Sequence, residues 1–247
     1  MPTWMRPSAV PPQIWLRENG IVVRDVTPDL DEYVIDLMAE IHSREAPLSK
    51  SAQLYNDQAS LEDVKRMWRH QSLPQRVSLV ALAEGSPGAD MEPVTPENPP
   101  IVLGANVLRV KCKADPEQNL VQAAKGKAFM KVFSHMEKFG QGVDLYERFQ
   151  IDHYLDAVGL AVGRSHRGLG ISEMLLRARR DLCTRLGIPL TKTVFTSTAA
   201  QRAAKRVGFQ VVKEMPFSEM KDDSGACDFP DLCDGNQTVQ LCAWKFN

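Results

Sequence analysis

The sequence predicts an α/β fold in which a mixed, twisted sheet of about seven strands is flanked by helices on both faces. The apolar run at residues 157–162 has the length and the valine content of a buried strand. Apolar residues in 171–186 then recur at steps of four, three, four and four, which is one face of a helix. The arginines of this segment, Arg179 among them, are expected to lie mostly off that face. Strand-like and helical segments alternate along the rest of the chain, as they do in α/β proteins.

In chain order, the pattern is a strand, two helices and two strands, then helix and strand in alternation, with two strands at the end. The expected strands are residues 20–26, 77–83, 101–110, 157–162, 189–196, 209–215 and 238–246. The expected helices are residues 28–42, 60–70, 115–140, 171–186 and 198–207. Gly187 and Gly208 follow the last two helices, where glycine commonly ends a helix. With 247 residues and 43% hydrophobic composition, the chain can bury a full core as a single domain over residues 20–247.

Three segments lack this periodicity. Residues 1–19 are expected to form an N-terminal arm, because four prolines fall within the first twelve positions. Residues 85–100 contain five prolines and two glycines and predict a long, mobile hairpin tip. Residues 218–236 carry five aspartates and one glutamate, which is typical of an exposed loop.

The connection between the strand at 157–162 and the helix at 171–186 has a composition suited to binding an anion. Gly168 and Gly170 allow a tight turn and a close approach of the backbone to a ligand. The free N–H groups and the dipole of the following helix favour a phosphate or pyrophosphate. A plain glycine turn is the alternative interpretation. A dinucleotide fingerprint is excluded because Glu173 occupies its third glycine position, and a P-loop because no Gly-Lys-Ser/Thr follows.

Charge and cysteine content narrow the class of protein. The net charge of −1 argues against a nucleic-acid partner, and no apolar run approaches the roughly 18 residues that span a membrane. The start of the chain lacks the apolar core of a secretory signal, so a cytoplasmic location is expected. Five scattered cysteines indicate a reduced protein. Cys227 and Cys233 lie among aspartates, but their spacing matches no zinc pattern, so no metal is expected.

The Arg167-Gly168-Leu169-Gly170 run resembles the pyrophosphate loop of the GNAT superfamily, the acetyl-CoA-dependent N-acetyltransferases. The position that usually holds Gln or Arg at the start of this loop is Ser165. The order of strands and helices also resembles the GNAT order over about residues 20–246. The more specific similarity is to the insect arylalkylamine N-acetyltransferase type, on Leu160-Ala161-Val162, Arg167 to Ile171, Phe195-Thr196-Ser197 and the long hairpin tip.

The resemblance implies direct acetyl transfer from acetyl-CoA to a small primary amine, such as an arylalkylamine or a polyamine. The strand backbone would hold the pantetheine and polarise the thioester, and the loop N–H groups would hold the pyrophosphate. The acetyl-CoA-binding residues implied are Leu160, Ala161, Val162, Arg167, Gly168, Leu169, Gly170, Ile171 and Ser172.

The catalytic residues implied depart from the family pattern. Insect members carry Asp-Glu-Pro-Leu with the glutamate as base, whereas this chain reads Glu45-Ala46-Pro47-Leu48. Glu45 is therefore the expected general base, with a solvated loop glutamate as the alternative. Ser197 is the hydroxyl expected near the CoA sulfur, with a helix cap as its alternative role.

Ala200 and Ala204 stand where family members often carry a serine and a tyrosine. These departures leave two other functions open. One is an acyl-CoA-binding GNAT protein without turnover, and the other is acetylation of protein N-termini or lysines. If Glu45 is not the base, Asp152 and Asp156 are the next candidates. The acceptor, the acyl chain and the oligomeric state are not predicted.

Overall fold

The computed structural model describes residues 4–116, 121–222 and 224–246, and its centre is one mixed sheet. The described strands lie in the order β1-β2-β3-β4-β5-β6-β8-β7. Only β5 and β6 run parallel, and every other neighbouring pair is antiparallel. The strands are β1 (Ile14–Glu18), β2 (Ile21–Asp25), β3 (Leu79–Ala83), β4 (Val102–Cys112), β5 (His153–Val162), β6 (Leu190–Phe195), β7 (Gln210–Pro216) and β8 (Thr238–Lys245). The predicted α/β fold class is confirmed, with eight strands where about seven were expected.

The additional strand is β1, which lies in the segment predicted to be an N-terminal arm. It pairs with β2 in an antiparallel hairpin. Asn19 and Gly20 form the turn with φ of 53° and 73°. An Asn-Gly pair with positive φ at both positions is the preferred two-residue hairpin turn. The sequence therefore contains a hairpin signal at Asn19-Gly20, although the four prolines of the first twelve residues led to the prediction of an arm.

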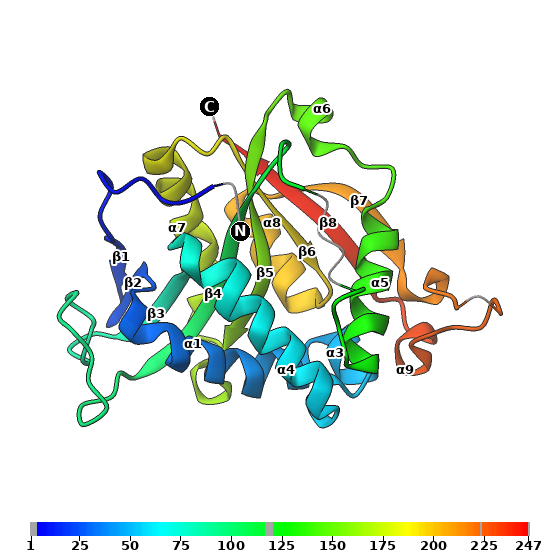
Figure 1. Ribbon diagram of the computed structural model, residues 1–247, viewed down its shortest axis with the longest axis horizontal. Helices are drawn as coiled ribbons and strands as arrows, with labels where there is room; N and C mark the ends of the chain where they lie inside the picture. The colour runs from blue at the N-terminus through cyan, green and yellow to red at the C-terminus, as the bar shows by residue number, and fades with distance from the viewer. Residues whose placement is uncertain (1–3, 117–120, 223, 247) are drawn as a thin grey trace.

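The helices cover both faces of the sheet, as Figure 1 shows. The α-helices are α1 (Asp31–Leu37), α2 (Ser43–Glu45), α3 (Pro47–Ser51), α4 (Gln58–Met67), α5 (Lys127–Gly140), α6 (Leu145–Phe149), α7 (Ile171–Leu186), α8 (Thr198–Val207) and α9 (Pro230–Cys233). Shorter or π-helical turns are η1 (Pro28–Leu30), η2 (Met38–His42), η3 (Leu54–Asn56), η4 (Trp68–Ser72), η5 (Leu73–Gln75), η6 (Arg164–His166) and η7 (Phe217–Glu219). Of the helix predicted at 115–140, the structure contains α5 from Lys127 onward, and residues 117–120 lie outside the described residues. The short helix α6 lies in a segment where no helix was expected.

Of the three apolar clusters among the described residues, two pack helices against the faces of the sheet. One packs α1, α4 and α5 against one face of the sheet. The other packs the predicted apolar face of α7, including Leu175, Ala178 and Leu182, against the opposite face. Arg179 was expected to lie off the buried face of α7, yet its side chain is fully buried. Its guanidinium remains inside because Asn106, Thr191 and Thr193 accept its hydrogen bonds.

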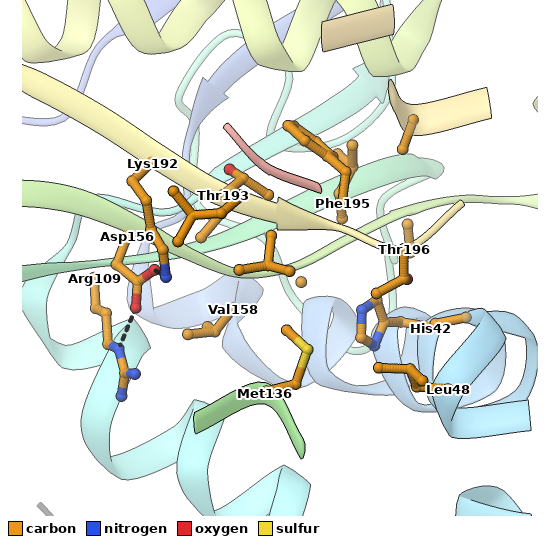
Figure 2. Close-up of a pocket in the computed structure, with 18 of the residues that line it drawn as sticks. His42, Leu48, Arg109, Met136, Asp156, Val158, Lys192, Thr193, Phe195 and Thr196 are labelled. Carbon is orange, nitrogen blue, oxygen red and sulfur yellow. Dashed lines mark hydrogen bonds and ion pairs between the residues drawn. The ribbon is translucent and has the colours of Figure 1, made fainter. Parts of the chain in front are cut away.

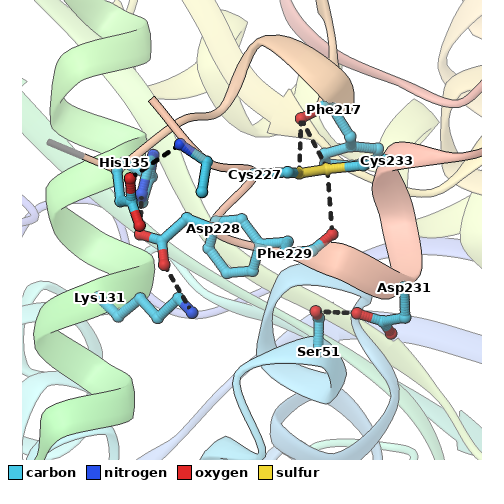
Figure 3. The surroundings of a disulfide bond; sticks show 11 residues. Ser51, Lys131, His135, Phe217, Cys227, Asp228, Phe229, Asp231 and Cys233 are labelled. Carbon is cyan, nitrogen blue, oxygen red and sulfur yellow. Dashed lines mark hydrogen bonds and ion pairs between the residues drawn. A yellow bond between two sulfur atoms is a disulfide. The ribbon is translucent and has the colours of Figure 1, made fainter. Parts of the chain in front are cut away.

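The acidic segment between β7 and β8 is anchored to the helices beside it. Asp228 contacts His135 and Lys131 of α5 at 2.6 and 2.7 Å (Figure 3). A disulfide joins Cys227 to Cys233 within the same segment. The expectation of a wholly reduced protein is therefore wrong for this pair. Sequence spacing could not reveal the pair, because only the fold of the segment brings the two sulfurs together.

The hairpin tip at residues 85–100 also folds back onto the domain. Ala89 is fully buried, and the guanidinium of the buried Arg24 donates to the carbonyl of Gly88. Asp29 accepts from the backbone N–H of Val94 at 2.8 Å. This packing replaces the mobile tip that composition alone predicts. Among the described residues, no helix has the length and apolar character needed to cross a membrane.

Candidate active site

A cavity of about 1930 Å³ opens beside the sheet and is lined by η2, α3 and α5 on one side and by residues of α7 and α8 on the other. Its walls come from η2 and α3, from α5, from β4, β5 and β6, and from the loop before α7. The predicted acetyl-CoA and catalytic residues meet here, although they come from distant parts of the sequence. Those that line the cavity are Glu45, Leu160, Ala161, Val162, Arg167, Gly168, Gly170, Ile171, Ser172 and Ser197. Leu169 does not line it, since its side chain points to solvent and is 55% exposed.

The cavity exists because β5 and β6 separate. They pair in parallel only from Leu155 to Ala157, and beyond Ala157 the β6 side of β5 has no strand partner among the described residues. On its other side, β5 remains paired with β4 as far as Val162, with Val158 as an extra bulged residue. A β-bulge bends a strand and increases its twist. The bulge therefore lies where the two strands diverge.

The separation leaves backbone groups of β5 available to a ligand. The N–H of Gly163 donates to the carbonyl of Leu103 on β4 at 2.9 Å. Because hydrogen-bonded and non-hydrogen-bonded pairs alternate along an antiparallel ladder, Ala161 also faces β4 with its N–H and C=O. Leu160 and Val162 then direct their backbone groups toward the opening. They can pair with an extended ligand as a neighbouring strand would.

The loop before α7 has the geometry of an anion site. Gly168 and Gly170 have φ of +82° and +77°, and the space beside each Cα is open. Glycine adopts positive φ without the steric strain that a side chain brings, so it is favoured at both positions of this turn. The N–H of Met174 makes the first bond within α7, to the carbonyl of Gly170. The N–H groups of the preceding turn are thus free of helix partners and face the loop.

Glu45 lies beside this loop, and its carboxylate contacts the guanidinium groups of Arg164 and Arg167. Burial alone would raise the pKa of Glu45, but the hydrogen bonds from Arg167 and Arg164 outweigh it and lower that pKa. A lowered pKa makes a carboxylate a weaker proton acceptor. The fold therefore links Glu45 to the anion site, and its role as general base stays a prediction.

Ser197 occupies the N-cap of α8, where its Oγ accepts a hydrogen bond from the N–H of Ala200 at 3.3 Å. This is the helix-cap role that the sequence offered as an alternative. The side chain also lines the cavity, so its O–H remains available to a ligand. Both roles are compatible, because a hydroxyl can accept from the backbone and donate elsewhere.

His42 is a cavity residue that the sequence did not single out. It ends η2, and its ring packs edge-on against Trp68 with centroids 6.1 Å apart. A methyl group placed on Gly159 would lie 3.6 Å from its Nε2, so the ring lies beside β5 near the point of separation. Burial lowers the pKa of His42 to about 4, and its ring nitrogens have no hydrogen-bond partner among the described residues. A neutral imidazole therefore faces the cavity (Figure 2).

Asp156, one of the two reserve candidates for the base, belongs to a buried charge cluster. Its carboxylate contacts Nζ of Lys192 at 3.0 Å and Nε of Arg109 at 3.2 Å (Figure 2). Burial would raise the pKa of Asp156, but the charges of Lys192, Arg109 and Lys111 reverse the effect and hold it well below its usual range. Asp152, the other reserve candidate, is exposed and pairs with His153 away from the cavity wall.

The mixed sheet of eight described strands flanked by helices matches that of solved GNAT-fold structures, which confirms the predicted fold class. The crystal structure of a putative arylalkylamine N-acetyltransferase 7 from the yellow fever mosquito Aedes aegypti is similar to this chain, with a TM-score of 0.85 and 27% sequence identity over 98% of this chain and 99% of the other. Arylalkylamine N-acetyltransferase 2 from Aedes aegypti has a TM-score of 0.78 at 17% identity, over 93% of this chain and 100% of the other.

A third structure, the polyamine N-acetyltransferase of Drosophila melanogaster that forms N-acetylagmatine, has a TM-score of 0.70 at 20% identity, over 92% of this chain and 100% of the other. No protein-family model and no curated protein sequence matches the chain. The structural neighbours are N-acetyltransferases of the GNAT class, so the predicted resemblance and enzyme class are confirmed.

Proposed function

We propose that this chain transfers the acetyl group of acetyl-CoA directly to a small primary amine, with both substrates bound together. The observation that carries the proposal is the continuity of one cavity from the glycine loop to the unpaired edge of β5. That shape suits a long ligand with a pyrophosphate near one end and amide groups along an extended arm. The N–H groups at Gly168, Gly170 and Ser172 would hold the pyrophosphate, with Arg167 adding positive charge.

Backbone groups of Leu160 and Val162 would pair with the amides of the pantetheine arm. This pairing would set the thioester beside the bulge, where a backbone N–H of β5 can stabilise the oxyanion that forms on attack. Holding amine and thioester together accounts for a large part of the rate enhancement. The amine nitrogen forms the new bond to the acetyl carbon, the carbon–sulfur bond breaks, and the electron pair leaves on the thiolate.

The amine must lose a proton in this step. Glu45 is the acceptor that the family resemblance implies, and His42 is a second acceptor supported by its neutral ring beside β5. The hydroxyl of Ser197 would donate toward the departing sulfur. A strong acid is not essential, because a CoA thiol is a good leaving group.

A thiol-release assay with acetyl-CoA tests the proposal. The acceptor panel should contain monoamines, diamines and short peptides, and the Gly170→Asp variant should serve as the control without a functional loop. Amine-dependent release by the wild-type protein is expected. Release with peptides alone would instead support protein acetylation. If no acceptor causes thiol release although calorimetry shows that acetyl-CoA binds, the proposal is contradicted, and the result would support an acyl-CoA-binding protein without turnover.

A further inference from the structure

The cavity is lined by the guanidinium group of Arg109, of which only Nε has a hydrogen-bond partner among the described residues. Arg109 projects from β4 and is 9% exposed. Its Nε donates to Asp156 at 3.2 Å, while its two terminal nitrogens have no partner among the described residues. Those nitrogens belong to a side chain that lines the cavity, and Figure 2 shows the guanidinium extending past Asp156. A guanidinium carries five N–H donors, so these two nitrogens remain available to a ligand in the cavity.

The charges around Arg109 do not balance. Arg109, Lys111 and Lys192 surround the single buried carboxylate of Asp156, and the charge of Asp115 acts on Lys111 as well. Among the described residues of this cluster, three cations thus face two carboxylates. Val158 and Met136, which are apolar, line the cavity next to this cluster (Figure 2). Low local polarity strengthens the attraction of an excess positive charge for an anion.

We propose that Arg109, together with Lys192, binds an anionic group on the acceptor, so that the acceptor is an amine bearing a carboxylate or a phosphate. This inference rests on the proposed function and specifies its substrate class. A planar guanidinium with two free nitrogens matches the paired oxygens of either group. The same excess of positive charge disfavours polyamines and guanidinium amines, which place a second cation in the cavity.

The position of the cluster also sets the shape of the acceptor. Asp156 lies just before the strands separate, and Leu160 lies four residues further along β5, beyond the bulge at Val158. The anion and the reacting amine therefore lie at different ends of the acceptor. An ω-amino acid or an aminoalkyl phosphate meets this requirement better than an α-amino acid.

Acceptors of one chain length that differ only in their far end test this inference. Pentylamine ends in a methyl group, 5-aminopentanoate in a carboxylate and 1,5-diaminopentane in an ammonium, and 4-aminobutyl phosphate supplies the phosphate. We expect the better anionic acceptor to exceed pentylamine in kcat/KM by about 10- to 100-fold, the usual effect of a hydrogen bond to a charged group. The diamine should be the poorest, and the ratio of the two anionic acceptors distinguishes carboxylate from phosphate.

The Arg109→Gln variant should abolish this preference, because kcat/KM for the anionic acceptors should fall to the value for pentylamine. Arg180→Gln, an exposed arginine on α7, is the matched control and should retain the preference. A folding defect alone would affect all acceptors equally. If Arg109→Gln does not fold, inhibition of the wild-type protein decides: pentanoate should compete with pentylamine, whereas pentanol should not.

The experimental results distinguish a failure of this inference from a failure of the proposed acetyltransferase function. Turnover of pentylamine equal to or better than turnover of both anionic acceptors would overturn the inference and leave the acetyltransferase intact. If no amine supports thiol release, the proposed function fails. Calorimetric titration of 5-aminopentanoate and pentylamine into the CoA-bound protein then tests the anion site by itself, and equal affinities would overturn it.

Discussion

The side-chain amide of Asn106 donates a hydrogen bond of 2.7 Å to the backbone carbonyl of Gly159, beside the bulge where β5 leaves β6. The carbonyl oxygen of the same side chain accepts from Nε of Arg179 at 2.7 Å. Arg179 also donates to Thr193 on β6 at 2.6 Å. One buried arginine of α7 thus contacts β6 directly, and the side chain of Asn106 on β4 connects it to β5 at the bulge. We infer that this network maintains the opening between β5 and β6.

Replacing Asn106 with alanine should lower the free energy of unfolding by about 1–3 kcal/mol, because the buried carbonyl of Gly159 and Nε of Arg179 would lose their partner. Urea denaturation measures this change. Asn98→Ala, at the exposed hairpin tip, is the control and should be nearly neutral. A loss for Asn106→Ala no larger than for the control would show that the network is dispensable.

Gly170→Asp should abolish the binding of acetyl-CoA, because the new carboxylate would lie among the N–H groups proposed to hold the pyrophosphate. Gly187→Asp is a matched control at the other end of α7, where the φ of +68° imposes a comparable backbone strain and the space is equally open. Calorimetric titration of both folded variants compares them. Equal affinities would exclude a phosphate-binding role for the loop.

Glu45→Gln removes the basic oxygen and keeps a side chain that can still accept from Arg164 and Arg167. If Glu45 is the general base, kcat/KM should fall by about 10²–10⁴-fold while the affinity for acetyl-CoA changes little. Because the pKa of Glu45 is lowered, the carboxylate stays ionised to unusually low pH, and its acidic limb in the pH–rate profile should lie below the usual range of a glutamate. Activity within a few-fold of wild type would assign Glu45 to loop positioning alone.

Local sequence signals were sufficient for most of the fold and for the loop. The apolar repeat of α7 and the glycines before it are neighbours in sequence, so periodicity and turn chemistry predict them directly. Buried polar networks are different, because their members meet only after folding. Arg109 and Asp156 are 47 residues apart, and Asp156 and Lys192 are 36 apart. Arg179 was misassigned for the same reason, since its partners lie on β4 and β6.

His42 provides a pH test of the cavity. Its pKa of about 4 in the folded protein lies below the ordinary value of 6.5, so the unfolded chain binds the proton more tightly. Stability is therefore complete above pH 6.5 and declines as the pH falls from 6.5 to about 4, by up to about 3 kcal/mol from this residue. His42→Gln cannot titrate, and its stability should depend less on pH across that window. Exposed His70→Gln should behave like the wild-type protein. Denaturant unfolding at intervals of half a pH unit gives the free energy of unfolding of all three proteins as a function of pH. If that free energy depends on pH in His42→Gln as it does in the wild-type protein, His42 can be protonated inside the folded cavity.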